Sequence, residues 1–105
     1  MTPRWRYTTA GWLSVAFCWL AVACHSGPTP EQCELLLDRY TELLVKQENP
    51  KVGDPELRTR KEAARSLAAT DPSFEFSSCQ RRVSRRQYEC AMAAPTVDTV
   101  ERCLL

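Results

Sequence analysis

The sequence predicts an all-α domain, a small three- to four-helix bundle stapled by two disulfides. After about residue 30, apolar residues recur at three- and four-residue spacing, which is the period of an amphipathic helix. Three segments start with a short polar residue and a proline, a pattern typical of helix starts, at Thr29-Pro30, Asp54-Pro55 and Asp71-Pro72. No segment alternates with period two, and no Asn-Gly hairpin signal occurs.

The first helix is predicted over residues 30–48. Thr29 is the expected N-cap, and Gln32 completes a capping box with it. Asn49-Pro50 is expected to end the helix, because proline disfavours the helical conformation of the residue before it. The expected buried stripe contains Cys33, Leu36, Leu37, Tyr40, Leu43 and Leu44.

The second helix is predicted over residues 55–69, after a turn at 49–53. Its expected inner face contains Leu57, Ala64, Leu67 and Ala68. Because most of these side chains are small, a neighbouring helix can approach closely.

Two further helices complete the predicted bundle. Residues 71–76 are expected to form a turn that places Phe74 and Phe76 in the core. A third helix is expected from about Cys79 to Ala94, capped by Ser77 or Ser78 and stopped by Pro95. The last helix should begin at 96–98 and carry Val97, Val100, Cys103 and Leu104 on its inner face.

The cysteine spacing restricts the disulfide pairing. Cys79 and Cys90 lie eleven residues apart on the predicted third helix, roughly 16 Å along its axis. A disulfide needs Cα atoms within about 7 Å, so each cysteine should bond to a different helix. A chain reversal near Pro95 favours Cys90–Cys103, which leaves Cys33–Cys79. The alternative pairing is Cys33–Cys90 with Cys79–Cys103. No C-x₂-C pair occurs, and we expect no metal site and no cofactor.

A secretory signal precedes the domain. Arg4 and Arg6 are followed by an apolar stretch from Ala10 to Ala23 and then by Cys24. That stretch is shorter than the approximately 20 residues that a membrane-spanning helix needs. We therefore expect residues 1–23 to be a signal peptide, 24–29 a flexible tether and 30–105 the domain.

The segment Leu20-Ala21-Val22-Ala23-Cys24 resembles the lipobox of bacterial lipoproteins. The resemblance implies that Cys24 receives a diacylglyceryl group and becomes the N-terminus. Lipidation of Cys24 also leaves an even set of four cysteines for two disulfides. Ala21-Val22-Ala23 is equally an A-x-A site for ordinary signal peptidase, which would cut at the same bond and release an unlipidated, secreted protein.

The composition argues against two classes of function, nucleic-acid binding and catalysis. Removing residues 1–23 from the 105 leaves 82, enough for one domain. This part keeps 12 of the 14 Lys and Arg residues, all but Arg4 and Arg6, and all 13 Asp and Glu residues. The near balance argues against nucleic-acid binding, which requires a basic excess. The single histidine, His25, lies in the tether, and no Gly-rich phosphate loop or C-x-x-C motif occurs, so we do not expect an enzyme.

One charged cluster is a candidate binding surface. Continuous helix across 79–94 would put Arg81 with Arg85, and Arg82 with Arg86, on shared faces as a basic strip for anionic lipid or an acidic partner. The competing interpretation is a solvated face in which Arg85 pairs with Glu89.

The mature region as a whole resembles the small cysteine-containing lipoproteins of Gram-negative envelopes. This resemblance implies a lipid anchor in the bacterial cell envelope, facing the periplasm. The resemblance also implies outer-membrane rather than inner-membrane sorting, because aspartate after the cysteine is the usual retention signal of that class and His25 follows Cys24 here. The predicted function is a non-catalytic module that binds an unidentified envelope protein. Two alternatives remain: a periplasmic carrier of a lipid or small apolar ligand, and a freely secreted disulfide-stabilised inhibitor or effector.

Overall fold

The computed structural model describes residues 27–105, and this part of the chain is helical without strands. The elements in chain order are α2 (Pro30–Glu48), α3 (Asp54–Thr70), the 3₁₀ helix η1 (Glu75–Ser78), α4 (Cys79–Arg82), α5 (Arg85–Ala93) and α6 (Val97–Leu104). The all-α prediction is confirmed. Within residues 27–105 no helix is long and apolar enough to cross a membrane. The predicted signal peptide and Cys24 lie outside the described residues.

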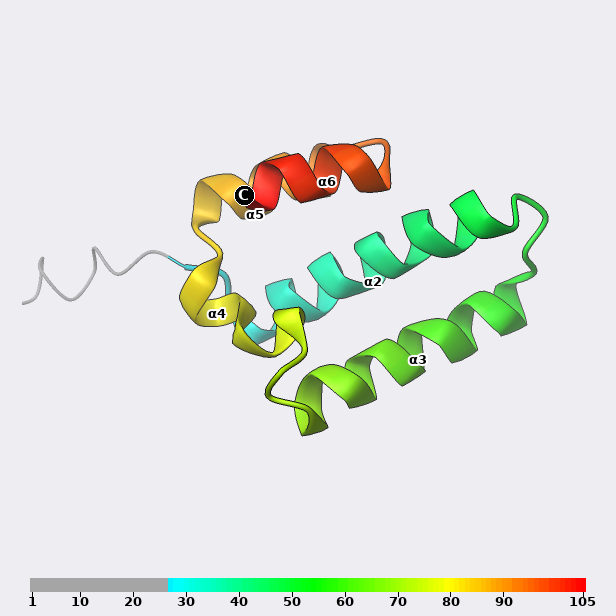
Figure 1. The fold of residues 1–105 in the computed structure, drawn as a ribbon, viewed down its shortest axis with the longest axis horizontal. Helices are drawn as coiled ribbons and strands as arrows, with labels where there is room; N and C mark the ends of the chain where they lie inside the picture. Colours follow the sequence, from blue (N-terminus) through cyan, green and yellow to red (C-terminus); the bar gives the residue numbers. More distant parts are fainter. Residues whose placement is uncertain (1–26) are drawn as a thin grey trace, which may run out of the picture.

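The helices form two hairpins that share α2 as their common neighbour (Figure 1). The α2–α3 hairpin turns at residues 49–53, and the α5–α6 hairpin packs on another side of α2. The start of α2, helix α4, the start of α5 and the end of α6 lie together at one end of the molecule, which we call the α4 end. The turns of both hairpins lie at the opposite end.

The core lies between α2 and the α5–α6 hairpin. Leu36, Ala91 and Val100 are each 0% exposed, and Cys79 and Ala94 are buried beside them. The prediction for α2 is confirmed in its bounds, its capping box and the burial of its stripe around Leu36. Burial of this stripe provides the main driving force for packing, because apolar area removed from water contributes about 25 cal/mol per Å².

Helix α3 differs from the prediction in its start and in one inner residue. It begins at Asp54 with Gly53 as N-cap, so Asp54 is not the cap. Leu57 is buried, but Leu67 is 43% exposed, and its placement on the inner face was wrong. At 100° per residue, Leu67 is turned by about 80° away from Leu57, whereas the half-buried Ala64 and Ala68 lie within about 20° of it.

The turn predicted at 71–76 is confirmed, but Asp71-Pro72 starts no helix and Phe74 is not part of the core. Asp71 acts as the C-cap of α3, and its carboxylate accepts a hydrogen bond from the Ser73 backbone N–H at 2.9 Å. Phe76 packs against the core, and the Phe74 ring lies on it with centroids 5.8 Å apart. Both rings are half-buried.

The predicted third helix is broken, and its continuity was wrong. α4 ends at Arg82, Val83 is extended (φ −94°, ψ 126°), and Ser84 starts a new helix. The Ser84 Oγ accepts from the Gln87 N–H at 3.1 Å, and the Gln87 Oε1 accepts from the Ser84 N–H at 2.8 Å. This capping box satisfies two backbone donors that a helix start otherwise leaves unpaired. The Ser84-x-x-Gln87 spacing is the sequence signal for the break.

Both predicted disulfides are confirmed. Cys33–Cys79 joins α2 to α4 with a Cα–Cα distance of 6.0 Å, and Cys90–Cys103 joins α5 to α6 with 5.7 Å. Their surroundings differ, because Cys79 is buried whereas Cys90 is exposed. The Cys33–Cys79 disulfide therefore lies at the core, whereas the Cys90–Cys103 disulfide is partly exposed to solvent.

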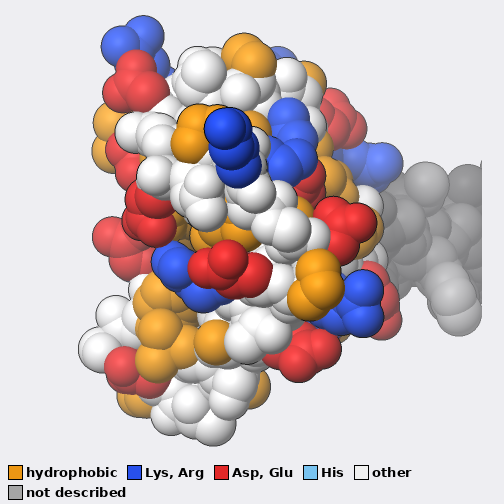
Figure 2. Space-filling model, turned by 90° about the vertical axis from the view of Figure 1, so that its right-hand side faces the viewer, with side chains coloured by type: hydrophobic (Ala, Val, Ile, Leu, Met, Phe, Trp, Pro, Cys, Tyr) orange, Lys and Arg blue, Asp and Glu red, His pale blue; other side chains and the backbone are white. Residues whose placement is uncertain are grey.

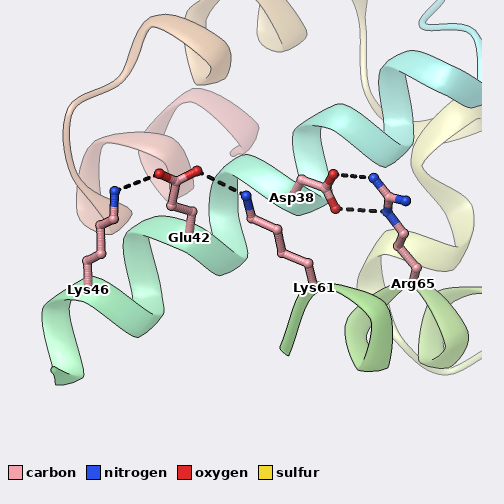
Figure 3. A network of polar contacts seen from close by, with 5 residues as sticks. All are labelled: Asp38, Glu42, Lys46, Lys61 and Arg65. Atoms are coloured by element: carbon pink, nitrogen blue, oxygen red, sulfur yellow. Dashed lines mark hydrogen bonds and ion pairs between the residues drawn. The ribbon is translucent and has the colours of Figure 1, made fainter. Parts of the chain in front are cut away.

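Ion pairs align α2 with α3 (Figure 3). The Arg65 guanidinium holds Asp38 through two hydrogen bonds, one of them from Nε to Oδ1 at 2.9 Å. The Glu42 carboxylate accepts from the Lys46 Nζ at 2.7 Å and from the Lys61 Nζ at 3.2 Å. The hydrogen bond from Lys46 lowers the pKa of Glu42 most, Lys61 adds to this, and partial burial opposes both. Such pairs contribute little stability each, but they fix the register of the two helices.

The lowered pKa of Glu42 predicts a pH effect on stability. A carboxyl whose folded pKa lies below its unfolded value of about 4.3 stabilises the fold above that value and stops doing so as pH falls through the folded pKa. Glu42→Gln is therefore expected to flatten the loss of stability below about pH 4. Urea denaturation at a series of pH values measures this. Glu48→Gln, at the longer 3.5 Å pair with Arg60, is the control and should change the slope less.

Candidate functional site

The described residues form an open cleft of about 640 Å³. It lies among α2, η1, α4, α5 and the end of α6. Phe76, Val83 and Leu104 provide apolar surface. Glu75, Arg82 and Glu101 add charges of both signs. The volume lies within the range of sites for small ligands or protein segments, and the mixed lining favours an occupant with both apolar and charged groups.

Tyr40 links the cleft to the core. Its hydroxyl donates a hydrogen bond to the Glu101 carboxylate at 3.0 Å, and its ring lies 5.3 Å from the Phe76 ring, centroid to centroid. Partial burial raises the pKa of Tyr40 to about 12, and the hydrogen bond to Glu101 together with the charges of Glu101 and Glu75 adds to the effect. Tyr40 is therefore a neutral donor near neutral pH, and it holds Glu101 at the cleft.

Removing the Glu101 charge should lower the pKa of Tyr40. In Glu101→Gln, the amide oxygen can still accept the hydrogen bond but carries no charge. The pKa is expected to fall from about 12 toward 10 without reaching it, because burial remains. Ultraviolet titration of the phenols measures this, with Tyr40→Phe to assign the transition. Glu89→Gln, at the exposed pair with Arg85, is the control. An unchanged Tyr40 pKa in Glu101→Gln would contradict the contact.

The same shift predicts alkaline destabilisation. Between about pH 10 and 12, the folded protein keeps the Tyr40 proton while the unfolded chain loses it. The free energy of unfolding should therefore fall as pH rises through this range. Tyr40→Phe should reduce that fall, as measured by urea denaturation at each pH.

The structure places Tyr40 and Phe76 on the cleft, whereas Tyr88 packs against the core and Phe74 covers Phe76. Glu101 and Leu104 were not recognised as cleft residues. Their helical spacing was visible in the sequence, but only the return of α6 alongside α2 brings them to Tyr40.

The predicted arginine strip does not run along one continuous helix. Because Val83 interrupts the helix, Arg81 and Arg82 end α4 and Arg85 and Arg86 begin α5. Arg82 faces the cleft, whereas Arg81 lines a shallow depression beside the end of α3. Arg85 forms an exposed ion pair with Glu89 at 3.5 Å, as the solvated-face interpretation predicts. All four arginines are exposed and lie at the α4 end.

The opposite end has a different surface. Figure 2 shows it with Lys and Arg interspersed among Asp and Glu, and with scattered hydrophobic side chains. Alternating charges of this kind are typical of a solvated surface. This end of the molecule carries no single-sign patch in that view.

Arg39 was not recognised from the sequence. Its Nη2 donates to the Ala94 carbonyl oxygen at 3.0 Å and so ties α2 to the α5–α6 turn, while its buried Nε has no partner among residues 27–105. An arginine that follows Asp38 on a helix gives no signal of this long-range contact.

Within residues 27–105, no group of three His, Cys, Asp or Glu side chains is placed to hold a metal ion. No family model, curated protein or solved structure matches the chain.

Proposed function

We propose that the mature chain is a lipid-anchored envelope protein whose helical domain binds another protein without catalysing a reaction. The cleft carries this proposal. It is open, and Phe76, Val83 and Leu104 lie beside the charged groups of Glu75, Arg82 and Glu101. A carrier of an apolar ligand would surround that ligand mainly with apolar walls. The mixed lining instead suits a partner segment with an apolar anchor and charged neighbours.

The lipid anchor rests on the lipobox-like sequence before Cys24 and on the cysteine count. Both disulfides form among the other four cysteines of the mature chain. Two or more acyl chains would hold the domain stably at a membrane, since each buried CH₂ contributes about 0.8 kcal/mol. Periplasmic location would also maintain the disulfides, because that compartment is oxidising.

The anchor is tested by the intact mass of the mature protein purified from envelope membranes of a Gram-negative host. The expected mass begins at Cys24, carries two or three acyl chains and lacks four hydrogens for two disulfides. An unmodified N-terminus at Cys24 would overturn the anchor and favour a secreted inhibitor or effector with a free thiol.

Partner binding is tested by chemical crosslinking in intact envelopes. Arg82→Glu reverses a charge in the cleft and should reduce recovery of any specific crosslinked protein. Arg58→Glu makes the same change on the exposed surface of α3 and is the matched control. Equal recovery from both variants would remove the cleft as the binding surface. Saturable uptake of an apolar dye that Leu104→Glu abolishes would instead favour the carrier.

A further inference from the structure

We propose that the α4 end of the domain lies against the headgroups of an anionic membrane, with the hairpin turns pointing away from it. This orientation rests on the lipid anchor proposed above. It is carried by two observations on the described residues: the path of the chain that enters α2, and the charge of the segment that this chain contacts.

The entering chain is packed onto the domain. Pro28 is buried, and Thr29 caps α2. A Cβ built on Gly27 would lie 3.3 Å from the Gln80 carbonyl oxygen, so the backbone runs close to α4 at this point. Residues 27–29 of the segment expected to be a flexible tether are therefore part of the domain surface. Only residues 24–26 of the expected mature chain then separate the anchor from the packed part of the domain.

The distance that the chain between Cys24 and Gly27 can span is short. A fully extended chain spans at most about 3.6 Å per residue, so the Cys24 and Gly27 Cα atoms can be at most about 11 Å apart. An acylated Cys24 lies at the boundary between headgroups and acyl chains. The surface beside Gly27, which is α4, must then lie at or just above the headgroups. The chain cannot let the domain turn its opposite end toward the membrane.

The segment held there is basic. Residues 79–88 contain four arginines and no acidic residue. Arg81, Arg82, Arg85 and Arg86 are all exposed. Glu75 and Glu89 are the acidic residues that bound the segment in the chain, and Glu89 pairs with Arg85. Juxtamembrane arginines are attracted to anionic lipid within about a Debye length of the surface. The tether thus presents to the membrane the segment with the greatest local excess of positive charge.

This orientation places the α4 end, where the cleft also lies, beside the membrane and the hairpin turns away from it. Figure 1 shows α2 running from the α4 end toward the hairpin turns. At 1.5 Å per residue, its 19 residues extend about 28 Å. The 49–53 turn would therefore face the periplasm at that height.

Arginine-specific labelling of the acylated protein tests the orientation. The full chain is expressed in a Gram-negative host, and the mature protein is purified from its membranes. After its mass establishes acylation, it is reconstituted into vesicles of phosphatidylcholine alone or with phosphatidylglycerol. Phenylglyoxal modification is then followed at each arginine by peptide mass spectrometry. The four arginines of 79–88 should react about threefold or more slowly on phosphatidylglycerol vesicles. Arg58 and Arg60, near the opposite end, should react equally on both.

Two matched variants make the result specific. Arg81→Glu with Arg86→Glu should abolish the lipid-dependent protection of Arg82 and Arg85. Arg58→Glu with Arg60→Glu reverses the same charge on α3 and should preserve it. Salt at about 1 M, where the Debye length is about 3 Å, should also remove the protection.

The outcomes separate this inference from the anchor itself. Absence of acyl chains in the mass would overturn the anchor, and with it the orientation. An acylated protein whose four arginines react equally on both vesicle types would overturn the orientation alone. Protection found in native envelopes but not on vesicles would assign the arginines to an acidic protein, and would likewise overturn binding to lipid.

Discussion

Replacing Cys33 and Cys79 together by alanine is expected to lower the free energy of unfolding by about 4 kcal/mol, because this disulfide closes a loop with a sequence separation of 46. In the chain-entropy model, a longer loop gives a larger loss of freedom in the unfolded chain. Cys79 is also buried beside Leu36 in the core. Chemical denaturation under oxidising conditions, compared with the unaltered protein, measures the effect.

The second disulfide provides the control. Cys90→Ala with Cys103→Ala opens a loop with a sequence separation of 13, for which the same model gives about 3 kcal/mol. Because Cys90 is exposed, this bond should also be reduced first when dithiothreitol is added to the folded protein. Alkylation and mass spectrometry at successive times would show the order. Earlier reduction of Cys33–Cys79 would contradict its protected position.

Leu36→Ala is expected to lower the free energy of unfolding by about 3 kcal/mol. Leu36 is 0% exposed at the centre of the core between α2 and the α5–α6 hairpin. Truncation removes buried apolar area and leaves a cavity that its neighbours fill only partly. Denaturation in urea, monitored by circular dichroism, measures the change.

The adjacent residue is a matched control for this substitution. Leu35 is 50% exposed on the same helix, so Leu35→Ala makes the same chemical change with about 0.5 kcal/mol or less of effect. Similar losses from both substitutions would mean that α2 does not present Leu36 to the core. A larger loss from Leu35→Ala would mean that this residue is covered in solution by another surface.

Much of the fold follows from local signals. The bounds of α2 follow from the Thr29-Pro30 start and the Asn49-Pro50 stop, because capping and the absence of a proline N–H act within one turn of helix. The signal for the break at Val83 is equally local, because Ser84 and Gln87 form the capping box that starts α5. It was missed because the apolar spacing on both sides also suits one continuous helix.

The disulfide pairing could be predicted from the sequence by simple helix geometry. Cys90–Cys103 follows from a short hairpin around Pro95, and Cys33–Cys79 follows by elimination. The premise of a continuous helix was wrong, yet the pairing is confirmed. The reversal near Pro95 and the antiparallel return of α3 determine which cysteines meet, and neither depends on the break at Val83.

By itself, the sequence determined the bounds of α2, its buried stripe, the Cys90–Cys103 disulfide and the lipobox-like leader, because each depends on neighbours within a few residues or on a short loop. Only the tertiary structure decided the cleft and the position of the arginines. Tyr40 meets Glu101 across 61 residues of sequence, and Gly27 meets Gln80 across a similar span. Such contacts depend on the angles at which whole helices pack, and these angles are set by the summed shape of many side chains rather than by any local pattern.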